Sequence, residues 1–295
     1  MVESGETRGD RARRVGTAWT WARRLLAERG VDDGTSDASV LLGLAVDRGS
    51  SVVWVEPERW LTRGQWVRYQ DLVAQRAQGR PTAYLTGEKE FWSLMFRVDT
   101  RVLIPRPESE HLVELVLEEC NRPDAHIVDM GTGSGCIGLS LCHALGESRV
   151  TGVDISAGAL CVARENACRL GLARRFCCVR GRGLDALANG GVDVVVSNPP
   201  YVAQEDLVAL PREVRDHEPR VALACAEGGL AVTWDVIAGA ERVLSESGLL
   251  VLEVDPRRAG AVEARLHQSG WMSVGVRRDL SGRPRVVHAR RGGPA

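Results

Sequence analysis

The four residues Asn198-Pro199-Pro200-Tyr201 have the types that can hold a planar nitrogen for reaction. An amide or exocyclic amine nitrogen shares its lone pair with a π-system, so it is a weak nucleophile and must be oriented by acceptors. The side-chain oxygen of Asn198 and the carbonyl oxygen of Pro199 can each accept one N–H and aim the nitrogen at an electrophilic methyl group. The prolines stiffen this segment, and Tyr201 offers a flat wall. We therefore expect catalysis by positioning and electrostatics, with a rigid turn that ends a strand as the alternative.

A second segment, Asp129-Met130-Gly131-Thr132-Gly133-Ser134-Gly135, joins an apolar run to a helix that we expect to begin near Cys136. Glycines let the backbone approach a ligand closely, and the helix offers free N–H groups at its start. The dinucleotide fingerprint G-x-G-x-x-G would need glycine at position 136, so this spacing disfavours a nicotinamide cofactor. A tight turn without a ligand remains the alternative.

Asp154 closes the next apolar run, about twenty residues after the glycines. An acidic side chain at this place can accept hydrogen bonds from both hydroxyls of a ribose. Its plainer role would be to cap a helix that starts at Ser156. Beside the glycine segment, Asp154 favours a cofactor that carries a ribose.

These three segments require a scaffold that brings strand ends together. Short apolar runs at 126–129, 150–154, 192–197 and 249–254 are separated by helix-length segments. This rhythm predicts an α/β fold with a parallel sheet, and ligands bind at the carboxyl edge of such sheets. Two further runs, 272–277 and 285–289, predict an antiparallel edge.

The N-terminal part has a different pattern. Residues 17–79 show helical periodicity, and Thr62 with Gln65 predicts a capping box. Residues 88–104 are rich in β-formers and predict a hairpin hinged near 99–101. We expect a helical domain at 1–85, a β-hairpin linker at 86–104 and the α/β domain at 105–295.

Composition limits the classes of function. The net charge is -1 and the pI about 6.6, so there is no global positive field to hold nucleic acid. Apolar runs are shorter than the roughly 20 residues of a membrane helix, so we expect a soluble protein. The eight cysteines contain no C-x-x-C pair, which predicts no metal site and mostly buried, reduced, intracellular thiols. Residues 1–14 mix arginines with acids and lack the apolar core of a secretory signal, so at most they form a weak or truncated transit peptide.

Five segments together resemble the HemK/PrmC family of protein-(glutamine-N5) methyltransferases. They are residues 83–92, 104–110, 129–135, 197–201 and 218–223, and the resemblance extends from about Thr17 to Arg291. It implies a seven-stranded class I (Rossmann-like) S-adenosylmethionine methyltransferase domain preceded by a small helical domain. It also implies methyl transfer to the side-chain nitrogen of the glutamine in the GGQ motif of a peptide-chain release factor, which the helical domain would grip.

The resemblance assigns roles to residues of this chain. The expected cofactor-binding residues are Asp129, Gly131, Thr132, Gly133, Ser134, Gly135, Asp154 and Asn198. The expected catalytic residues are Asn198, Pro199 and Tyr201, and the expected substrate-binding residues are these three with Pro200, Arg106 and Glu108.

Three positions depart from the family pattern. Ser109 replaces the usual threonine and keeps the hydroxyl. Arg182 stands where an acid usually contacts the adenine amine; Asp185 or the backbone near Gly183 could serve instead. Asp255 differs from the bacterial pattern and resembles the animal mitochondrial branch. We therefore expect a monomer in the mitochondrial matrix that acts on a mitochondrial release factor, with the cytoplasm as the alternative.

Two other functions remain open at this stage. An adenine-N6 DNA or RNA methyltransferase would need the same grip on an exocyclic amine, but it predicts a basic groove and a target-recognition domain. A cofactor-binding protein without turnover, serving as an interaction module, is suggested by Arg182 and opposed by the intact motifs.

Overall fold

The computed structural model describes residues 13–292, so the prediction of a weak transit peptide lies largely outside the described residues. The chain forms two compact units. The first comprises the described part of Met1–Gly87 together with Pro211–His217, and the second comprises Glu88–Leu210 and Glu218–Ala295. The division between the units thus lies at 87/88, with the hairpin in the second unit and the later segment Pro211–His217 in the first.

The first unit is helical, as predicted. Its helices are α2 (Val15–Glu28), α3 (Gly34–Ala45), α4 (Val52–Val55), α5 (Arg63–Ala77), α6 (Thr82–Thr86) and α10 (Arg212–His217). The capping box is confirmed, since Gln65 N donates to Thr62 Oγ1 and Thr62 N donates to Gln65 Oε1. Tyr69 is fully buried, and its hydroxyl donates to Ala38 O, which joins α5 to α3.

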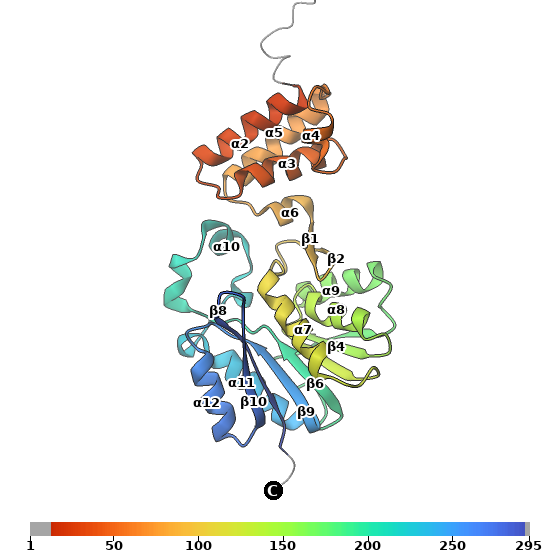
Figure 1. The fold of residues 1–295 in the computed structure, drawn as a ribbon, viewed down its shortest axis with the longest axis vertical. Helices are drawn as coiled ribbons and strands as arrows, with labels where there is room; N and C mark the ends of the chain where they lie inside the picture. The colour runs from red at the N-terminus through yellow and green to blue at the C-terminus, as the bar shows by residue number, and fades with distance from the viewer. Residues whose placement is uncertain (1–12, 293–295) are drawn as a thin grey trace, which may run out of the picture. The chain divides into compact units, whose positions relative to one another are not determined.

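A seven-stranded sheet forms the second unit (Figure 1). Its order is β10-β11-β9-β6-β3-β4-β5. The strands are β3 (His126–Met130), β4 (Arg149–Asp154), β5 (Phe176–Arg180), β6 (Val192–Ser197), β9 (Leu244–Glu253), β10 (Met272–Arg278) and β11 (Pro284–Arg290). All neighbours are parallel except β11, which is antiparallel to both β9 and β10. The predicted class I fold is confirmed.

Helices cover both faces of this sheet. The helices α7 (Glu110–Glu119), α8 (Cys136–Ala144) and α9 (Ala157–Arg169) pack on one face, and α11 (Ala231–Val243) and α12 (Ala259–Gln268) pack on the other (Figure 1). Central strand β6 shows why its sequence is continuously apolar. Val194 and Val196 face the first set of helices, whereas Val195 faces the second.

The hairpin turns at a different place from the one predicted. Strands β1 (Glu88–Phe91) and β2 (Leu94–Arg97) are joined by Trp92 and Ser93, not near residues 99–101. Both turn residues have positive φ, 52° and 57°, the conformation that two-residue hairpins require. Their amides donate to Glu110 Oε1 and Glu90 Oε1, so two carboxylates stabilise a turn that lacks glycine and asparagine.

The helices and the cysteines bear on two further predictions. None of the described helices is long and apolar enough to cross a bilayer. All eight cysteines are free, but only Cys136, Cys142 and Cys225 are buried. The prediction of mostly buried thiols is therefore wrong. Among the described residues, no cluster of His, Cys, Asp or Glu could hold a metal ion.

Candidate active site

The sequence motifs meet at the carboxyl edge of the sheet. Met130 of β3 pairs with Val153 of β4 and with Ser197 of β6, so the segments that follow these three strands begin side by side. A cavity of about 480 Å³ lies at this edge. Five of the predicted site residues line it: Gly131, Gly133, Asp154, Asn198 and Pro200.

The glycine segment has a backbone that only glycine adopts easily. Gly131, Gly133 and Gly135 all have positive φ, 74°, 54° and 82°. Gly131 and Gly133 expose backbone to the cavity, whereas Gly135 forms the N-cap of α8, where a Cβ would lie 2.8 Å from Leu139 Cδ1. The first two glycines are thus placed for close approach to a ligand, and the third is needed for helix packing.

Asp154 ties the end of β4 to the glycine segment. Its Oδ2 accepts a hydrogen bond from Gly133 N at 3.0 Å, and its Oδ1 accepts one from Ser156 N at 2.9 Å. Ser156 itself caps α9 by accepting from Ala159 N. Burial raises the pKa of Asp154, while the backbone N–H bonds oppose that rise. Each carboxylate oxygen keeps a lone pair for a ligand in the cavity.

Asn198 is oriented by a serine from another segment. Its Nδ2 donates to Ser109 Oγ at 3.0 Å, so its Oδ1 is the atom left to accept a hydrogen bond from a substrate. The carbonyl oxygen of Asn198 is the heavy atom closest to a Cβ built on Gly131, at 3.9 Å. The Asn198 segment and the glycine segment are therefore adjacent. Pro199 is buried and Tyr201 half-buried, and neither lines the cavity itself.

Arg106 and Glu108 are not among the lining residues. Arg106 Nη2 forms an ion pair of 2.5 Å with Glu218 Oε1, and Ile104 N donates to Glu218 Oε2 at 3.2 Å. Glu218 is buried, so it anchors the segment from Ile104 to Arg106 against the chain that follows α10. Glu108 is half-buried. Their predicted role in binding substrate stays a prediction.

Sequence reasoning missed Asn166 of α9. This side chain is fully buried. Its Oδ1 accepts from Arg97 N at 2.7 Å, and its Nδ2 donates to Arg97 O at 3.0 Å and to Ser134 O at 2.8 Å. Asn166 therefore fixes the glycine segment to the end of the hairpin, a long-range contact for which its local sequence gives no signal.

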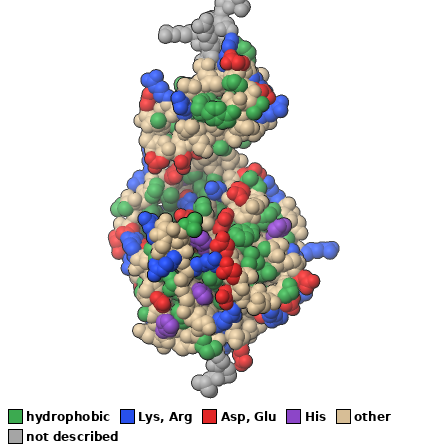
Figure 2. All heavy atoms as spheres, viewed as in Figure 1, with side chains coloured by type: hydrophobic (Ala, Val, Ile, Leu, Met, Phe, Trp, Pro, Cys, Tyr) green, Lys and Arg blue, Asp and Glu red, His purple; other side chains and the backbone are tan. Residues whose placement is uncertain are grey.

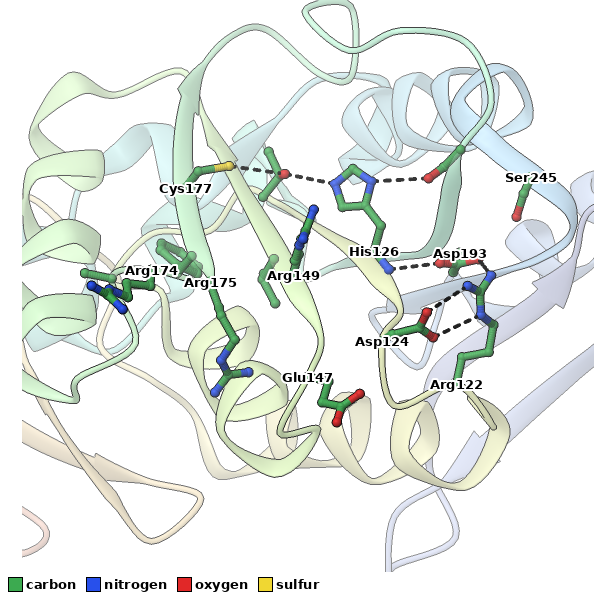
Figure 3. A pocket seen from close by; sticks show the side chains of 15 residues that line it. Arg122, Asp124, His126, Glu147, Arg149, Arg174, Arg175, Cys177, Asp193 and Ser245 are labelled. Atoms are coloured by element: carbon green, nitrogen blue, oxygen red, sulfur yellow. Dashed lines mark hydrogen bonds and ion pairs between the residues drawn. The ribbon is translucent and has the colours of Figure 1, made fainter.

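A larger hollow, of about 980 Å³, lies at the opposite edge of the sheet, where the parallel strands begin (Figure 3). Its polar side chains mainly bind one another. Arg122 pairs with Asp124 and Asp193, and His126 Nε2 shares a hydrogen bond of 3.0 Å with Thr151 Oγ1. The hollow contains none of the predicted site residues. We therefore assign the site to the smaller cavity.

Comparison with known proteins identifies the family. The model described as "PrmC N-terminal domain" matches residues 17–87, and the one described as "Methyltransferase small domain" matches residues 108–213. A release factor glutamine methyltransferase of Nitratidesulfovibrio vulgaris is 40% identical, over 92% of this chain and 92% of that protein. The chain belongs to the family of release factor glutamine methyltransferases.

Other matches agree with this assignment. The human protein named MTRF1L release factor glutamine methyltransferase is also 40% identical, over 82% of this chain and 75% of that protein. Among solved structures, the hMettl16 catalytic domain in complex with MAT2A 3'UTR hairpin 6 superposes with a TM-score of 0.55 at 16% identity, over 76% of this chain and 82% of that one. The last match supports the fold alone.

The methyl donor of this class, S-adenosylmethionine, fits the residues of the site. Asp129 is fully buried; its Oδ2 accepts from Thr132 Oγ1 at 2.7 Å and from Gly138 N at 3.0 Å. Its Oδ1 is buried without a hydrogen-bond partner among the described residues, and burial raises its pKa to about 6. A buried, unpaired carboxylate oxygen matches a cofactor that carries an ammonium and a sulfonium group.

Arg182 and Gly183 line the cavity, as the resemblance implies for the adenine pocket. Asp185 is exposed and does not line it, so the suggested compensation by Asp185 is not supported. The acids in the lining are Asp154 and Asp235 of α11. Asp235 was not identified from the sequence, because it lies more than fifty residues after Arg182 in an ordinary helical pattern.

Replacing Asp154 with alanine is expected to raise the dissociation constant for S-adenosylmethionine roughly ten- to hundredfold, because it removes charge-assisted acceptors. Isothermal titration calorimetry on the full chain would measure this. Asp124→Ala removes an exposed carboxylate at the opposite edge of the sheet and should leave the constant unchanged. Equal affinity in both variants would contradict the ribose role of Asp154.

Proposed function

We propose that the chain transfers the methyl group of S-adenosylmethionine to the side-chain nitrogen N5 of the glutamine in the GGQ motif of a peptide-chain release factor. The observation that carries this proposal is the orientation of Asn198. Its Nδ2 is engaged by Ser109 Oγ, so Oδ1 presents an acceptor at the cavity, beside the glycine segment. The proposal also rests on membership of the family, whose N-terminal and methyltransferase models both match.

The chain supplies position more than acid–base chemistry. When bound, the cofactor supplies an electrophilic methyl group on a sulfonium. Asn198, which lines the cavity, accepts one N–H of the amide with Oδ1, and the carbonyl oxygen of the adjacent Pro199, which does not line the cavity, is the predicted acceptor of the other, so that the nitrogen lone pair points toward the methyl group. Bound S-adenosylmethionine would give up this methyl group with its sulfur leaving as a thioether, and the nitrogen would lose one proton to solvent. The oriented acceptors stabilise the positive charge that develops on the nitrogen.

The adenine-N6 alternative is not favoured. On the face of the sheet-bearing unit seen in Figure 2, basic and acidic side chains are interspersed. Two arginines of β10 and β11 are also paired: Arg277 with Glu118 and Arg290 with Glu119, both glutamates of α7. Paired arginines have less charge to offer a phosphate backbone.

The test is methylation of defined substrates by the full chain with labelled S-adenosylmethionine. The substrates are a release factor, the same factor with its GGQ glutamine replaced by alanine, and adenine-containing duplex DNA. Label on the intact factor alone, located by mass spectrometry on the glutamine, supports the proposal. Label on DNA supports the adenine alternative, and cofactor binding without any transfer supports an inactive module.

We also propose that the substrate is a mitochondrial release factor and that the enzyme acts as a monomer in the mitochondrial matrix. The pattern around Asp255 supports this assignment, although the bacterial and human relatives are equally identical to the chain. Relative kcat/KM for mitochondrial and bacterial factors would test the substrate. Cell fractionation tests the compartment, and sedimentation tests the monomer.

A further inference from the structure

A buried carboxylate lies behind Asn198, at the carboxyl end of β9. Glu253 is 3% exposed. Its Oε2 accepts a hydrogen bond from Ser109 Oγ at 2.5 Å, and its Oε1 accepts one from the Tyr201 hydroxyl at 3.3 Å. Glu253 does not line the cavity, so any effect it has on a ligand there must pass through the residues that it contacts.

The number of protons in this chain of contacts fixes the orientation of Asn198. Ser109 has one hydroxyl hydrogen, and it donates that hydrogen to Glu253. Its lone pairs are then the only groups it can offer to Asn198, so the Asn198 side chain must turn its NH2 toward Ser109. An Asn198 side chain flipped by 180° would place Oδ1 against a serine oxygen that has no hydrogen to give.

We propose that Glu253, acting through Ser109, is a positioning residue that holds the Asn198 amide with Oδ1 toward the substrate, while its second oxygen holds the hydroxyl of Tyr201 in the same motif. This inference rests on the proposed function. One carboxylate oxygen thus binds Ser109, which in turn binds Asn198, and the other oxygen binds the Tyr201 hydroxyl.

The arrangement requires Glu253 to be ionised. A protonated Glu253 could donate to Ser109, whose hydrogen would then be free to bind Asn198 Oδ1 and allow the flipped, unproductive orientation. Burial raises the pKa of Glu253, while the bonds from Ser109 and Tyr201 lower it. The charge of Glu108 also raises the pKa of Glu253, and the charge of Arg285 of β11 lowers it. The Glu253 carboxylate in turn contributes to the raised pKa of the Cys136 thiol on α8.

Because the pKa is raised, the productive form is lost as the pH falls through a value above that of an ordinary glutamate. The kcat of the wild-type enzyme at saturating S-adenosylmethionine should therefore show an acid limb. Asp129 and Asp154 also have raised pKa values, so their protonation could weaken cofactor binding at low pH. Saturating S-adenosylmethionine removes this contribution from kcat.

The first test compares serine variants. Ser109→Ala should lower kcat roughly tenfold or more, with KM for the release factor and affinity for S-adenosylmethionine nearly unchanged. Ser109→Thr keeps the hydroxyl and should retain most of the kcat. Ser140→Ala is the matched control, because Ser140 is fully buried on α8 and its hydroxyl has no partner among the described residues.

The second test is Glu253→Gln, in which an NH2 group replaces one acceptor oxygen. We expect kcat to fall roughly ten- to hundredfold and the acid limb to disappear, with calorimetric affinity for S-adenosylmethionine retained as evidence of folding. Tyr201→Phe should lower kcat less than Glu253→Gln does, because it removes only the hydrogen bond between the Tyr201 hydroxyl and Glu253.

The outcomes separate this inference from the proposed function. A wild-type chain that labels no release factor would overturn the proposed function. A wild-type chain that is active, while Ser109→Ala and Glu253→Gln match Ser140→Ala in kcat and in pH profile, would overturn the positioning role alone.

Discussion

Replacing Asn198 with alanine is expected to lower kcat for methyl transfer by at least roughly a hundredfold, without unfolding the chain. The side chain supplies one of two acceptors for the substrate amide, and loss of a single preoriented polar group in an active site typically has this size. Asn198 is half-buried, and its side chain donates a hydrogen bond to Ser109 Oγ. Little packing is lost, so thermal stability should change by less than about 1 kcal/mol.

The measurement is steady-state methylation of a release factor at saturating S-adenosylmethionine, with unfolding followed in parallel by circular dichroism. Asn121→Ala is a suitable control, since Asn121 is exposed in the loop between α7 and β3. Asn198→Asp separates orientation from charge: it keeps an acceptor but cannot donate to Ser109 when ionised. Wild-type kcat in the alanine variant would exclude Asn198 as an acceptor for the nucleophile.

The sequence predicted the site where the fold imposes a common edge. Gly131, Asp154 and Asn198 each follow an apolar run, and adjacent parallel strands carry their carboxyl ends to the same side. Local pattern was sufficient for these residues because each is defined by its place on its own strand. The positive φ values of the glycines then explain why those positions need glycine.

Residues that act across the fold were not predictable in this way. Glu253 lies in an apolar strand, and its partner Ser109 is 144 positions earlier in the chain. Asn166 binds Arg97 from 69 positions away. No local pattern signals these pairs, because burial and tertiary contact create them. The ion pair of Arg106 with the buried carboxylate of Glu218, 112 positions later, was likewise not predictable from a local pattern.

Two elements of the fold were misjudged for physical reasons. The turn at Trp92 and Ser93 has positive φ in residues that rarely adopt it, and carboxylates compensate for the missing glycine. Strand β5 was not predicted because it is an edge strand, where only Phe176 among the five residues is buried. An edge strand with one buried face position carries too little apolar periodicity to be recognised.

Replacing Arg76 with alanine is expected to destabilise the helical unit by about 3–5 kcal/mol. Arg76 of α5 is 7% exposed and forms ion pairs with Asp37 Oδ2 at 2.6 Å and with Glu213 Oε2 of α10 at 2.8 Å. Its removal leaves Asp37, 8% exposed, with a buried charge and the Thr82 hydroxyl as a remaining donor. Glu213 would also lose its ion pair with Arg76, a contact that holds the segment Pro211–His217 in the helical unit.

Denaturant unfolding of the full chain, followed by tryptophan fluorescence, would measure this effect. Most of the eight tryptophans lie in the helical unit: Trp19, Trp21, Trp54, Trp60 and Trp66. Arg68→Ala is the matched control, because Arg68 is on the same helix and pairs with Asp47 at the surface, where an ion pair contributes less than about 1 kcal/mol. Equal midpoints for the two variants would contradict the prediction.

A double variant distinguishes loss of attraction from the cost of an unpaired charge. If the instability of Arg76→Ala arises because Asp37 is left buried and unpaired, then Asp37→Ala combined with Arg76→Ala should be more stable than Arg76→Ala alone. If the instability arises from the lost anchor of α10, the second substitution will not restore stability, and Glu213→Ala alone should reproduce much of the effect. Arg76 thus binds Glu213 of the segment Pro211–His217 and helps to hold this late segment in the helical unit. In the sequence, the segment lies between the Asn198 motif and Glu218, which pairs with Arg106.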